Sequence, residues 1–280
     1  MREKRGHSDF DLSEPEFLIS VMDRHTDWCV IVCLIGDGQE INTGEAGING
    51  WLLALQSQFP DWAIHMSDRV AIRNGQGEED LTHILRVRLQ HSPALHLGVS
   101  IRSFRAETVS EFVDAVVRGE RDLARRAFPK LSQYPIVVTR DLAKARAWLR
   151  QQARGSERYG LVASSNALRL KPAGLYVKSA IDPPIWYLAN KSDVRSSFAL
   201  EDLATEFDVQ GLELDWTGVC WDANLRWMGD HWGYYSFRGS RWETVRDPAR
   251  ATFLGNAYRV LLTRARQGMV VFVPEGDDAD

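Results

Sequence analysis

The chain has 280 residues, of which 44% are hydrophobic, and this suffices for one large or two medium domains with a buried core. A net charge of −4 at pH 7 argues against a protein that coats nucleic acid by bulk positive charge, but it does not exclude a local basic groove. No stretch approaches the roughly 18 apolar residues of a membrane span, and residues 1–15 have no apolar signal core, so we expect a cytoplasmic protein with no membrane partner.

The cysteines give no sign of a metal or disulfide site. Cys29, Cys33 and Cys220 form an odd set without a ligand-like partner pattern. We expect free thiols in a reducing compartment and no metal centre.

The first part of the chain alternates between helix and strand patterns. Residues 15–24 predict a short helix, and residues 28–35 form a nearly unbroken apolar run that predicts a strand buried on both faces of a parallel sheet. A helix over 47–57, a short strand over 62–66 and a loop over 73–80 follow. This order predicts the first of two α/β domains.

The second α/β domain is predicted to follow a boundary near Ser92, because a new alternation of strands and helices starts there. The two domains are then 1–92 and 93–280. The predicted strands of the second domain are 95–101, 136–139, 160–164 and 270–273, and its predicted helices are 107–117 and 141–152. This alternation is typical of a doubly wound sheet.

A glycine-rich turn follows the first long strand prediction. In Gly36-Asp37-Gly38-Gln39, glycine permits a tight turn, and the Gln39 amide is suited to sensing a terminal phosphate or an attacking water. The alternative is a plain turn after a strand. The extension over 40–47 (EINTGEAG) makes the segment more distinctive.

Two arginines lie at the start of the second domain, in the segment SIRSFRAE (100–107). The guanidinium of Arg102 is suited to a phosphate because its fork can donate two hydrogen bonds to phosphate oxygens. The alternative is that Arg102 and Arg105 form a surface pair where a strand ends.

The segment ATEFDVQGLELD (204–215) combines a glycine with acidic residues. Gly211 would let the backbone approach nucleic acid or a nucleotide, and the Glu213 carboxylate can accept hydrogen bonds from ribose hydroxyls. Both features point to a ligand contact in this segment.

The segment YRVLLTRAR (258–266) places Arg264 and Arg266 after an apolar stretch. An arginine at such a position can neutralise the charge that develops on a transferred phosphoryl group. The alternative is an amphipathic helix with Tyr258, Leu261 and Leu262 in the core and the arginines in water.

Residues 216–250 are rich in aromatic side chains and also contain arginines, a combination suited to stacking bases and holding phosphates. Trp227 and Trp232 are the candidates for stacking. The alternative is a satellite hydrophobic cluster beneath a long insertion.

The four motif segments resemble motifs III, IV, V and VI of superfamily 1 helicases, in the expected order. The string GQEINTGEAG (38–47) resembles the Schlafen group 3-like DNA/RNA helicase domain family, and the resemblance covers roughly residues 10–275. It implies an α/β fold with a RecA-like P-loop-NTPase-type parallel sheet flanked by helices. A partial first lobe would span 1–92, and a complete second lobe would span 93–280 with an aromatic-rich insertion at 216–250.

The resemblance also implies a role for each matching residue, with ATP and Mg²⁺ as cofactors. Arg264 matches an arginine finger, and Gln39 and Arg102 complete the implied catalytic set. The implied nucleotide-binding set is Gly36, Asp37, Gly211, Glu213 and Arg266, and the set for nucleic acid is Trp227, Trp232 and Arg105. Gln210 stands where related helicases usually have lysine, so a phosphate contact from that position is not expected.

A phosphate-binding loop is not found in the sequence. None of the six lysines follows a glycine, and no convincing Asp-Glu-Ala-Gln segment is present. We therefore expect a truncated helicase-like chain that does not hydrolyse ATP alone and binds ATP and Mg²⁺ only with the missing lobe. One alternative is a split enzyme, in which a separate chain supplies that lobe. The expected partner is DNA or RNA in single-stranded form. The alternative is a non-catalytic module, derived from a helicase, that binds nucleic acid or a partner protein.

Overall fold

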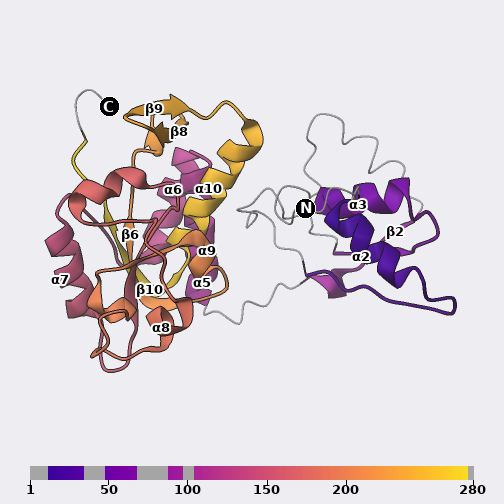
Figure 1. The fold of residues 1–280 in the computed structure, drawn as a ribbon, viewed down its shortest axis with the longest axis horizontal. Coiled ribbons are helices and arrows are strands. Elements are labelled where there is room, and N and C mark those ends of the chain that lie inside the picture. Colours follow the sequence, from indigo (N-terminus) through magenta and orange to yellow (C-terminus); the bar gives the residue numbers. More distant parts are fainter. Residues whose placement is uncertain (1–11, 35–47, 68–87, 97–103, 277–280) are drawn as a thin grey trace. The chain divides into compact units, whose positions relative to one another are not determined.

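The computed structural model describes residues 12–34, 48–67, 88–96 and 104–276 (Figure 1). The chain divides into two compact units, unit 1 over Met1–Val99 and unit 2 over Ser100–Asp280. Each unit has hydrophobic clusters of its own.

The described residues of unit 1 form two α-helices and a parallel pair of short strands. Its helix α2 begins at Ser13, where the Ser13 hydroxyl accepts from the Glu16 N–H and the Glu16 carboxylate accepts from the Ser13 N–H. This capping box satisfies two N–H groups that a helix start leaves without partners. The elements are α2 (Glu14–Met22), α3 (Ile48–Ser57), β1 (Ile64–Met66), β2 (Leu89–His91) and a 3-10 turn, η1 (Pro93–Leu95).

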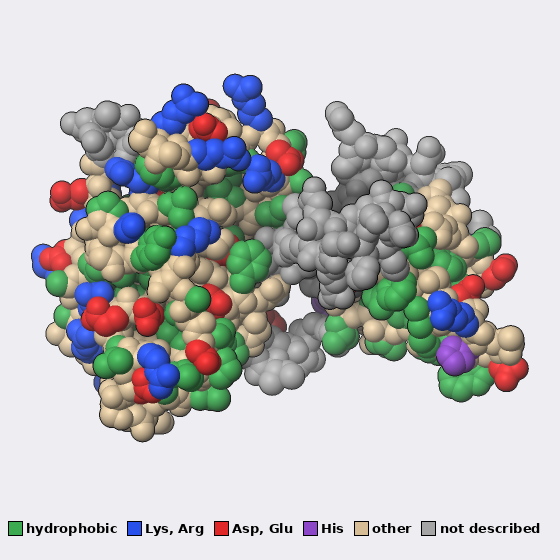
Figure 2. Space-filling model, viewed as in Figure 1, with side chains coloured by type: hydrophobic (Ala, Val, Ile, Leu, Met, Phe, Trp, Pro, Cys, Tyr) green, Lys and Arg blue, Asp and Glu red, His purple; other side chains and the backbone are tan. Residues whose placement is uncertain are grey.

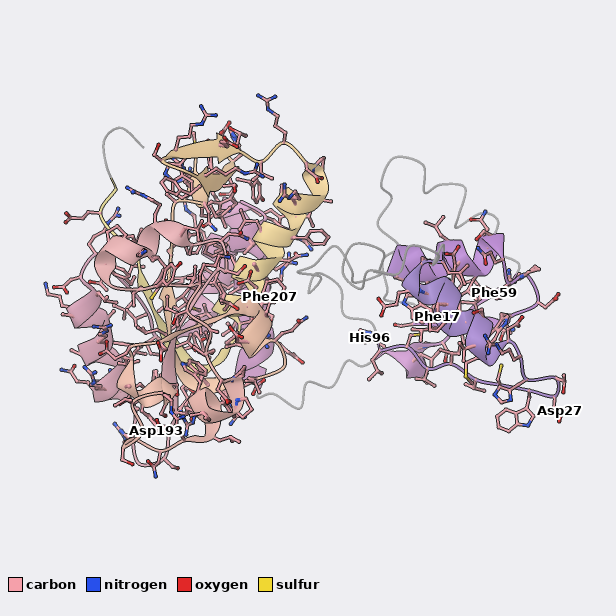
Figure 3. All side chains as sticks on the ribbon, viewed as in Figure 1. Phe17, Asp27, Phe59, His96, Asp193 and Phe207 are labelled. Atoms are coloured by element: carbon pink, nitrogen blue, oxygen red, sulfur yellow. The ribbon has the colours of Figure 1, made fainter. Side chains whose placement is uncertain are left out.

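The core of unit 1 lies between its two helices and the chain that follows α3. Ile19, Ala54 and Phe59 are the buried members of one cluster, and Leu52 and Ile64 are those of a second; Figure 3 labels Phe59 and, on α2, Phe17. The Arg88 guanidinium donates to the carbonyls of Phe59 and Trp62 at 2.7–2.8 Å, so it ties β2 to this core. The predicted helices 15–24 and 47–57 and the predicted strand 62–66 are confirmed.

The strand predicted over 28–35 is wrong for the described part of that range. Residues 28–34 form no strand, and Trp28, Val30, Val32 and Leu34 are 65–80% exposed. A strand needs neighbours that pair with its N–H and C=O groups. Among the described residues of unit 1, the only such pairing is between β1 and β2. The loop predicted over 73–80 lies outside the described residues, as do residues 97–101 of the predicted strand 95–101.

Unit 2 is built on a five-stranded sheet in which every neighbouring pair of strands is parallel. The order is β3 (Ile136–Thr139), β10 (Ala265–Phe272), β6 (Leu214–Cys220), β4 (Tyr159–Ala163) and β5 (Leu203–Thr205). Strand β4 is buried along its whole length, as expected for a parallel strand covered on both faces. The expected α/β class with a parallel sheet flanked by helices is confirmed, and it is consistent with a RecA-like lobe.

Helices cover this sheet on both sides, with α7 on one side and α5 with α10 on the other (Figure 1). They are α5 (Phe104–Val117), α6 (Arg121–Ala127), α7 (Leu142–Gln152), α8 (Pro183–Leu188), α9 (Glu206–Val209) and α10 (Pro248–Leu262), with 3-10 turns at Phe128–Leu131, Leu168–Ala173 and Ser197–Ala199. The predicted helices 107–117 and 141–152 and strands 136–139, 160–164 and 270–273 are confirmed. Among the described helices, none is long and apolar enough to cross a membrane.

A glycine lets α7 lie close to the sheet. A Cβ at Gly218 of β6 would stand 2.6 Å from Leu161, closer than real Cβ atoms come, and 3.0 Å from Leu149 of α7, a very tight contact. Helix α7 starts at Asp141, whose carboxylate accepts from the N–H groups of Ala143 and Lys144. The start of α7 and the missing side chain at Gly218 together fix this face of the core.

Between β6 and α10 the chain forms a small antiparallel sheet. It consists of β7 (Leu225–Trp227), β8 (Trp232–Arg238) and β9 (Arg241–Thr244) in that order, and Figure 1 shows β8 and β9 at one end of unit 2. The segment leaves the main sheet at the carboxyl end of β6, so it lies beyond that end of the strand.

Candidate functional site

Two segments that are far apart in the sequence meet where β6 and β10 begin. The two strands are parallel neighbours with Leu214 opposite Ala265, and the Leu214 N–H donates to the Arg264 carbonyl at 2.9 Å. The residues just before β6, which include Gly211 and Glu213, therefore lie beside Arg264 and Arg266. The structure brings together four of the residues that the sequence singled out.

The turn before β6 depends on a glycine. Gly211 has φ +86°, in the left-handed region that residues with a side chain avoid, and the Leu212 N–H closes the turn onto the Val209 carbonyl at 3.0 Å. A Cβ added at Gly211 would meet no described atom within 4 Å. The requirement for glycine is therefore conformational, and the space beside the backbone is open.

Arg264 is turned inward and is only 2% exposed. Its Nε donates to the Val260 carbonyl at 2.9 Å, and its Nη1 donates to the carbonyls of Val209 and Leu212 at 3.4 and 3.3 Å. These bonds fasten the end of α10 to the turn that contains Gly211. Helix α10 buries Tyr258, as the helix alternative expects, but Arg264 is not in water.

Glu213 and Arg266 form an ion pair at the same edge. The Arg266 Nε donates to the Glu213 carboxylate at 2.8 Å, and the side chains are 58% and 18% exposed respectively. The hydrogen bond that Arg266 donates to Glu213 raises the pKa of Arg266, so the guanidinium stays charged. The Glu213 carbonyl also accepts from the Tyr187 hydroxyl at 2.7 Å, which fixes the backbone of the acidic residue.

At the opposite end of the sheet, where the parallel strands finish, lie buried polar groups that we did not predict from the sequence. Glu206, at the carboxyl end of β5, is 2% exposed, and its carboxylate accepts from the Ser165 N–H and hydroxyl at 2.7 and 2.8 Å. Burial raises the pKa of Glu206. The sequence did contain a signal for this group, because polar residues that directly follow parallel strands gather at the same end of a sheet.

Asp222 and Asn224, after β6, form a second buried polar group at this end of the sheet. The Tyr258 hydroxyl, from α10, donates to the Asn224 side-chain oxygen at 2.5 Å and accepts from the Asp222 N–H at 3.2 Å. Burial raises the pKa of Asp222 and of Tyr258. The network ties α10 to the point where the antiparallel segment leaves the main sheet.

Trp227 and Trp232 lie side by side and pack onto the α5–α6 corner. Their rings are 5.2 Å apart at 80°, and the Trp232 Nε1 donates to the Val116 carbonyl at 2.7 Å. A Cβ at Gly119 would be 3.1 Å from the Trp227 ring. Both side chains are half-buried, so much of their aromatic surface is in contact with unit 2 itself.

The remaining candidate residues are not part of these contacts. Gly36, Asp37, Gln39 and Arg102 lie outside the described residues, and Arg105 belongs to the first turn of α5. In the part of the chain that is described, no group of three or more His, Cys, Asp or Glu side chains is placed to hold a metal ion.

Comparison with known families decides what kind of domain this is. The model for the Schlafen group 3 DNA/RNA helicase domain matches residues 1–275. The chain belongs to this family. A Schlafen group 3 helicase domain implies contact with nucleic acid, and the parallel sheet of unit 2 agrees with a helicase lobe of RecA-like type. No curated protein matches the chain.

Proposed function

We propose that the chain is the part of an ATP-dependent DNA or RNA helicase or translocase that contacts the nucleotide through the start of β6 and β10. The single observation that supports this most is the meeting of the Gly211 turn with the Glu213–Arg266 pair. We also propose that Gly36, Asp37, Gln39 and Arg102 contact ATP, as the helicase resemblance implies. In each helicase cycle, the residues that bind ATP would act together with the residues that bind nucleic acid.

The residues at this edge fit ATP in their chemistry. A guanidinium is suited to phosphate oxygens, and Arg266 uses only Nε for Glu213 while its side chain remains 58% exposed. The Glu213 carboxylate can accept from ribose hydroxyls. The open space beside Gly211 permits close approach of a ligand to the backbone. ATP with Mg²⁺ would supply the phosphoryl group whose transfer drives movement.

Arg264 would take part only after exchanging its present partners. Its Nε and Nη1 donate to backbone carbonyls and its Nη2 donates to the Thr263 hydroxyl, and all of these acceptors are neutral. A phosphate oxygen is a charged and therefore stronger acceptor, so the exchange is favoured when a phosphate is presented beside the Gly211 turn. The lysine of a P-loop is proposed to come from a lobe on a separate chain, because none of the six lysines here follows a glycine.

The test is binding of a fluorescent ATP analogue, followed by anisotropy, with the chain combined with the protein that supplies the P-loop lobe, since ATP binding is expected only with that lobe. Arg266→Ala should weaken binding by about 10-fold or more, because a charged hydrogen bond contributes about 1.5–3 kcal/mol. Arg125→Ala is the matched control, since Arg125 is also exposed and also has an acidic neighbour, Asp122. Equal affinity of Arg266→Ala and wild type would overturn the site.

The purified chain by itself tests the need for a separate lobe. The chain alone should show no ATP hydrolysis with or without single-stranded DNA or RNA. Hydrolysis by the chain alone that disappears in Arg264→Ala would overturn the proposal that the P-loop comes from elsewhere, while leaving the role of Arg264 in place.

A second candidate function is a non-catalytic module that binds nucleic acid or a partner protein. The observation that favours it is the burial of Arg264, whose bonds to carbonyls are those of a structural residue. Under this function, single-strand affinity survives Arg264→Ala and drops in Trp227→Ala/Trp232→Ala. A loss of affinity in Arg264→Ala alone, in protein that remains folded, would contradict it.

A further inference from the structure

The turn between β8 and β9 carries two like charges opposite each other. Arg238 and Arg241 are cross-strand partners, joined by the two-residue turn Gly239-Ser240, in which Gly239 has φ +60°. Like charges at directly opposed positions destabilise a pair of strands. Arginine at both positions therefore does not stabilise the hairpin.

A single carboxylate, that of Glu243, is paired with both arginines. Glu243 lies 3.7 Å from the Arg238 Nε and 3.3 Å from the Arg241 Nη2, while the two arginine side chains are 60% and 80% exposed. A single negative charge cannot neutralise two guanidinium groups. The tip of the hairpin consequently keeps a positive charge that faces water.

Two more arginines continue this charge from β9 into α10. Arg246 and Arg250 are exposed, and neither forms an ion pair within the described part of the chain. The nearby Asp247 uses its carboxylate to cap α10, where it accepts from the Ala249 N–H at 3.0 Å. We call Arg238, Arg241, Arg246 and Arg250 the arginine ridge.

The ridge stands out against the charge of the whole chain. Residues 238–250 contain these four arginines and two acidic residues, Glu243 and Asp247, so the segment carries +2 while the chain carries −4. Figure 2 shows Lys and Arg side chains gathered at the end of unit 2 that Figure 1 assigns to β8, β9 and the start of α10. A local positive surface on an acidic protein is an electrostatic footprint for a polyanion.

The base of the hairpin is held firmly by aromatic and cationic side chains. Arg226 lies over the rings of Tyr235 and Trp242 at 4.1 and 4.9 Å, and Phe237 meets Trp242 edge to face at 5.1 Å. The Val245 N–H donates to the Tyr234 carbonyl at 2.9 Å. The exposed arginines are thus attached to a well-packed hairpin base, so less conformational entropy is lost when a ligand binds.

We propose that the arginine ridge binds the phosphate backbone of a single nucleic-acid strand, an inference that rests on the proposed function. Separate guanidinium groups along a hairpin and a helix start suit a row of phosphates better than one small anion. Trp227 and Trp232 are less suited to this contact, because their rings are packed against each other and against the α5–α6 corner. The ridge also lies beyond the carboxyl end of β6, whereas the Gly211 turn precedes its start, so both ligands fit at once.

The experiment measures binding of fluorescein-labelled 20-mers of dT and of rU to the full chain across a salt series. For single strands each phosphate contact contributes about 0.7 to the slope of log affinity against log salt. Arg246→Ala/Arg250→Ala should therefore lower the slope by about 1.4 and weaken binding by about 10-fold at low salt. Arg246→Lys/Arg250→Lys should keep most of the slope, because it keeps both charges.

The matched control is Arg125→Ala/Arg126→Ala on α6. It removes the same number of exposed positive charges, so it separates position from net charge. Arg241→Ala adds a second readout, since removing one of two opposed like charges should weaken binding without lowering the melting temperature. A simple loss of folding would lower both.

Each outcome has a distinct meaning. No binding by wild-type protein overturns both the ridge and the proposed function. Wild-type binding that falls equally in the ridge and control variants overturns the ridge alone, as does preferential binding of a polyglutamate peptide over either oligonucleotide. A loss confined to the ridge variants supports the inference, and the dT and rU arms then show whether DNA or RNA is preferred.

Discussion

The Arg264 guanidinium donates to the carbonyl of Val209, a residue 55 positions earlier, at 3.4 Å. The same side chain reaches Leu212 and Val260, so one buried cation joins the end of α10 to the turn before β6. The residue with the strongest catalytic resemblance is therefore also a structural one in this conformation.

Arg264→Ala should destabilise unit 2 by about 2–4 kcal/mol, because it leaves buried carbonyls without donors and creates a cavity. The measurement is urea unfolding followed by tryptophan fluorescence. Arg266→Ala is the matched control, and it should change stability by less than about 1 kcal/mol since its ion pair is exposed to solvent. Equal losses in both variants would show that the inward bonds of Arg264 contribute little.

Gly211→Ala should cost about 1–2 kcal/mol through backbone strain alone, because the left-handed conformation is unfavourable for alanine and its Cβ would meet nothing. Gly211→Asn should cost less, since asparagine tolerates this region better. Gly276→Ala, at a glycine without positive φ, serves as the control. Thermal unfolding of the three variants gives the comparison, and an unchanged Gly211→Ala protein would rule out the strain.

The buried Glu206 should make stability fall as pH rises. Burial raises the folded-state pKa above the ordinary 4.5, so the folded state holds a proton that the unfolded state releases. Stability from this group is therefore full below about pH 4.5 and is lost as pH climbs through the raised pKa. The stability of Glu206→Gln relative to wild type should therefore increase as the pH rises above the ordinary carboxyl pKa of 4.5.

The control for this pH dependence is Glu107→Gln, at an exposed position on α5. Chemical unfolding of both variants and of wild type at pH 5 and pH 8 gives the two differences. A Glu206→Gln difference that stays flat with pH, like that of the control, would mean that the carboxyl is ionised in the folded protein across this range.

Tyr258→Phe should cost about 1–3 kcal/mol, because it leaves the Asn224 side-chain oxygen and the Asp222 N–H without the tyrosine hydroxyl in a buried site. Tyr176→Phe removes a hydroxyl from a tyrosine that is 46% exposed, and it should be close to neutral. Urea unfolding distinguishes them. Hydrogen exchange at the Asp222 amide should also accelerate in Tyr258→Phe alone.

The parts of the fold that follow from local chemistry were predictable. Residues 136–139 carry the β-branched pattern of β3, and Asp141 is a helix cap that marks the start of α7 whatever surrounds it. The presence of a parallel sheet follows from the alternation of such segments. These signals need no knowledge of distant residues.

The remaining parts depend on partners that the pattern does not specify. The apolar run over 28–34 has strand composition, yet no described strand pairs with it. The inward turn of Arg264 depends on carbonyls 52 and 55 positions away. The packing of Trp232 onto α5 depends on the Val116 carbonyl, 116 positions earlier. Side-chain placement of this kind is set by tertiary contacts rather than by spacing.

Helix α10 is a rigid connection between two parts of unit 2. Its 15 residues correspond to a rod of about 22 Å, with Arg250 in its first turn and Arg264 just past its last. Figure 3 labels Phe207 on α9, the short helix that packs beside α10 and leads into the Gly211 turn. Because an α-helix is stiff along its axis, the ridge and the Gly211 turn are set at a fixed separation, and neither end can shift along that axis without moving the other.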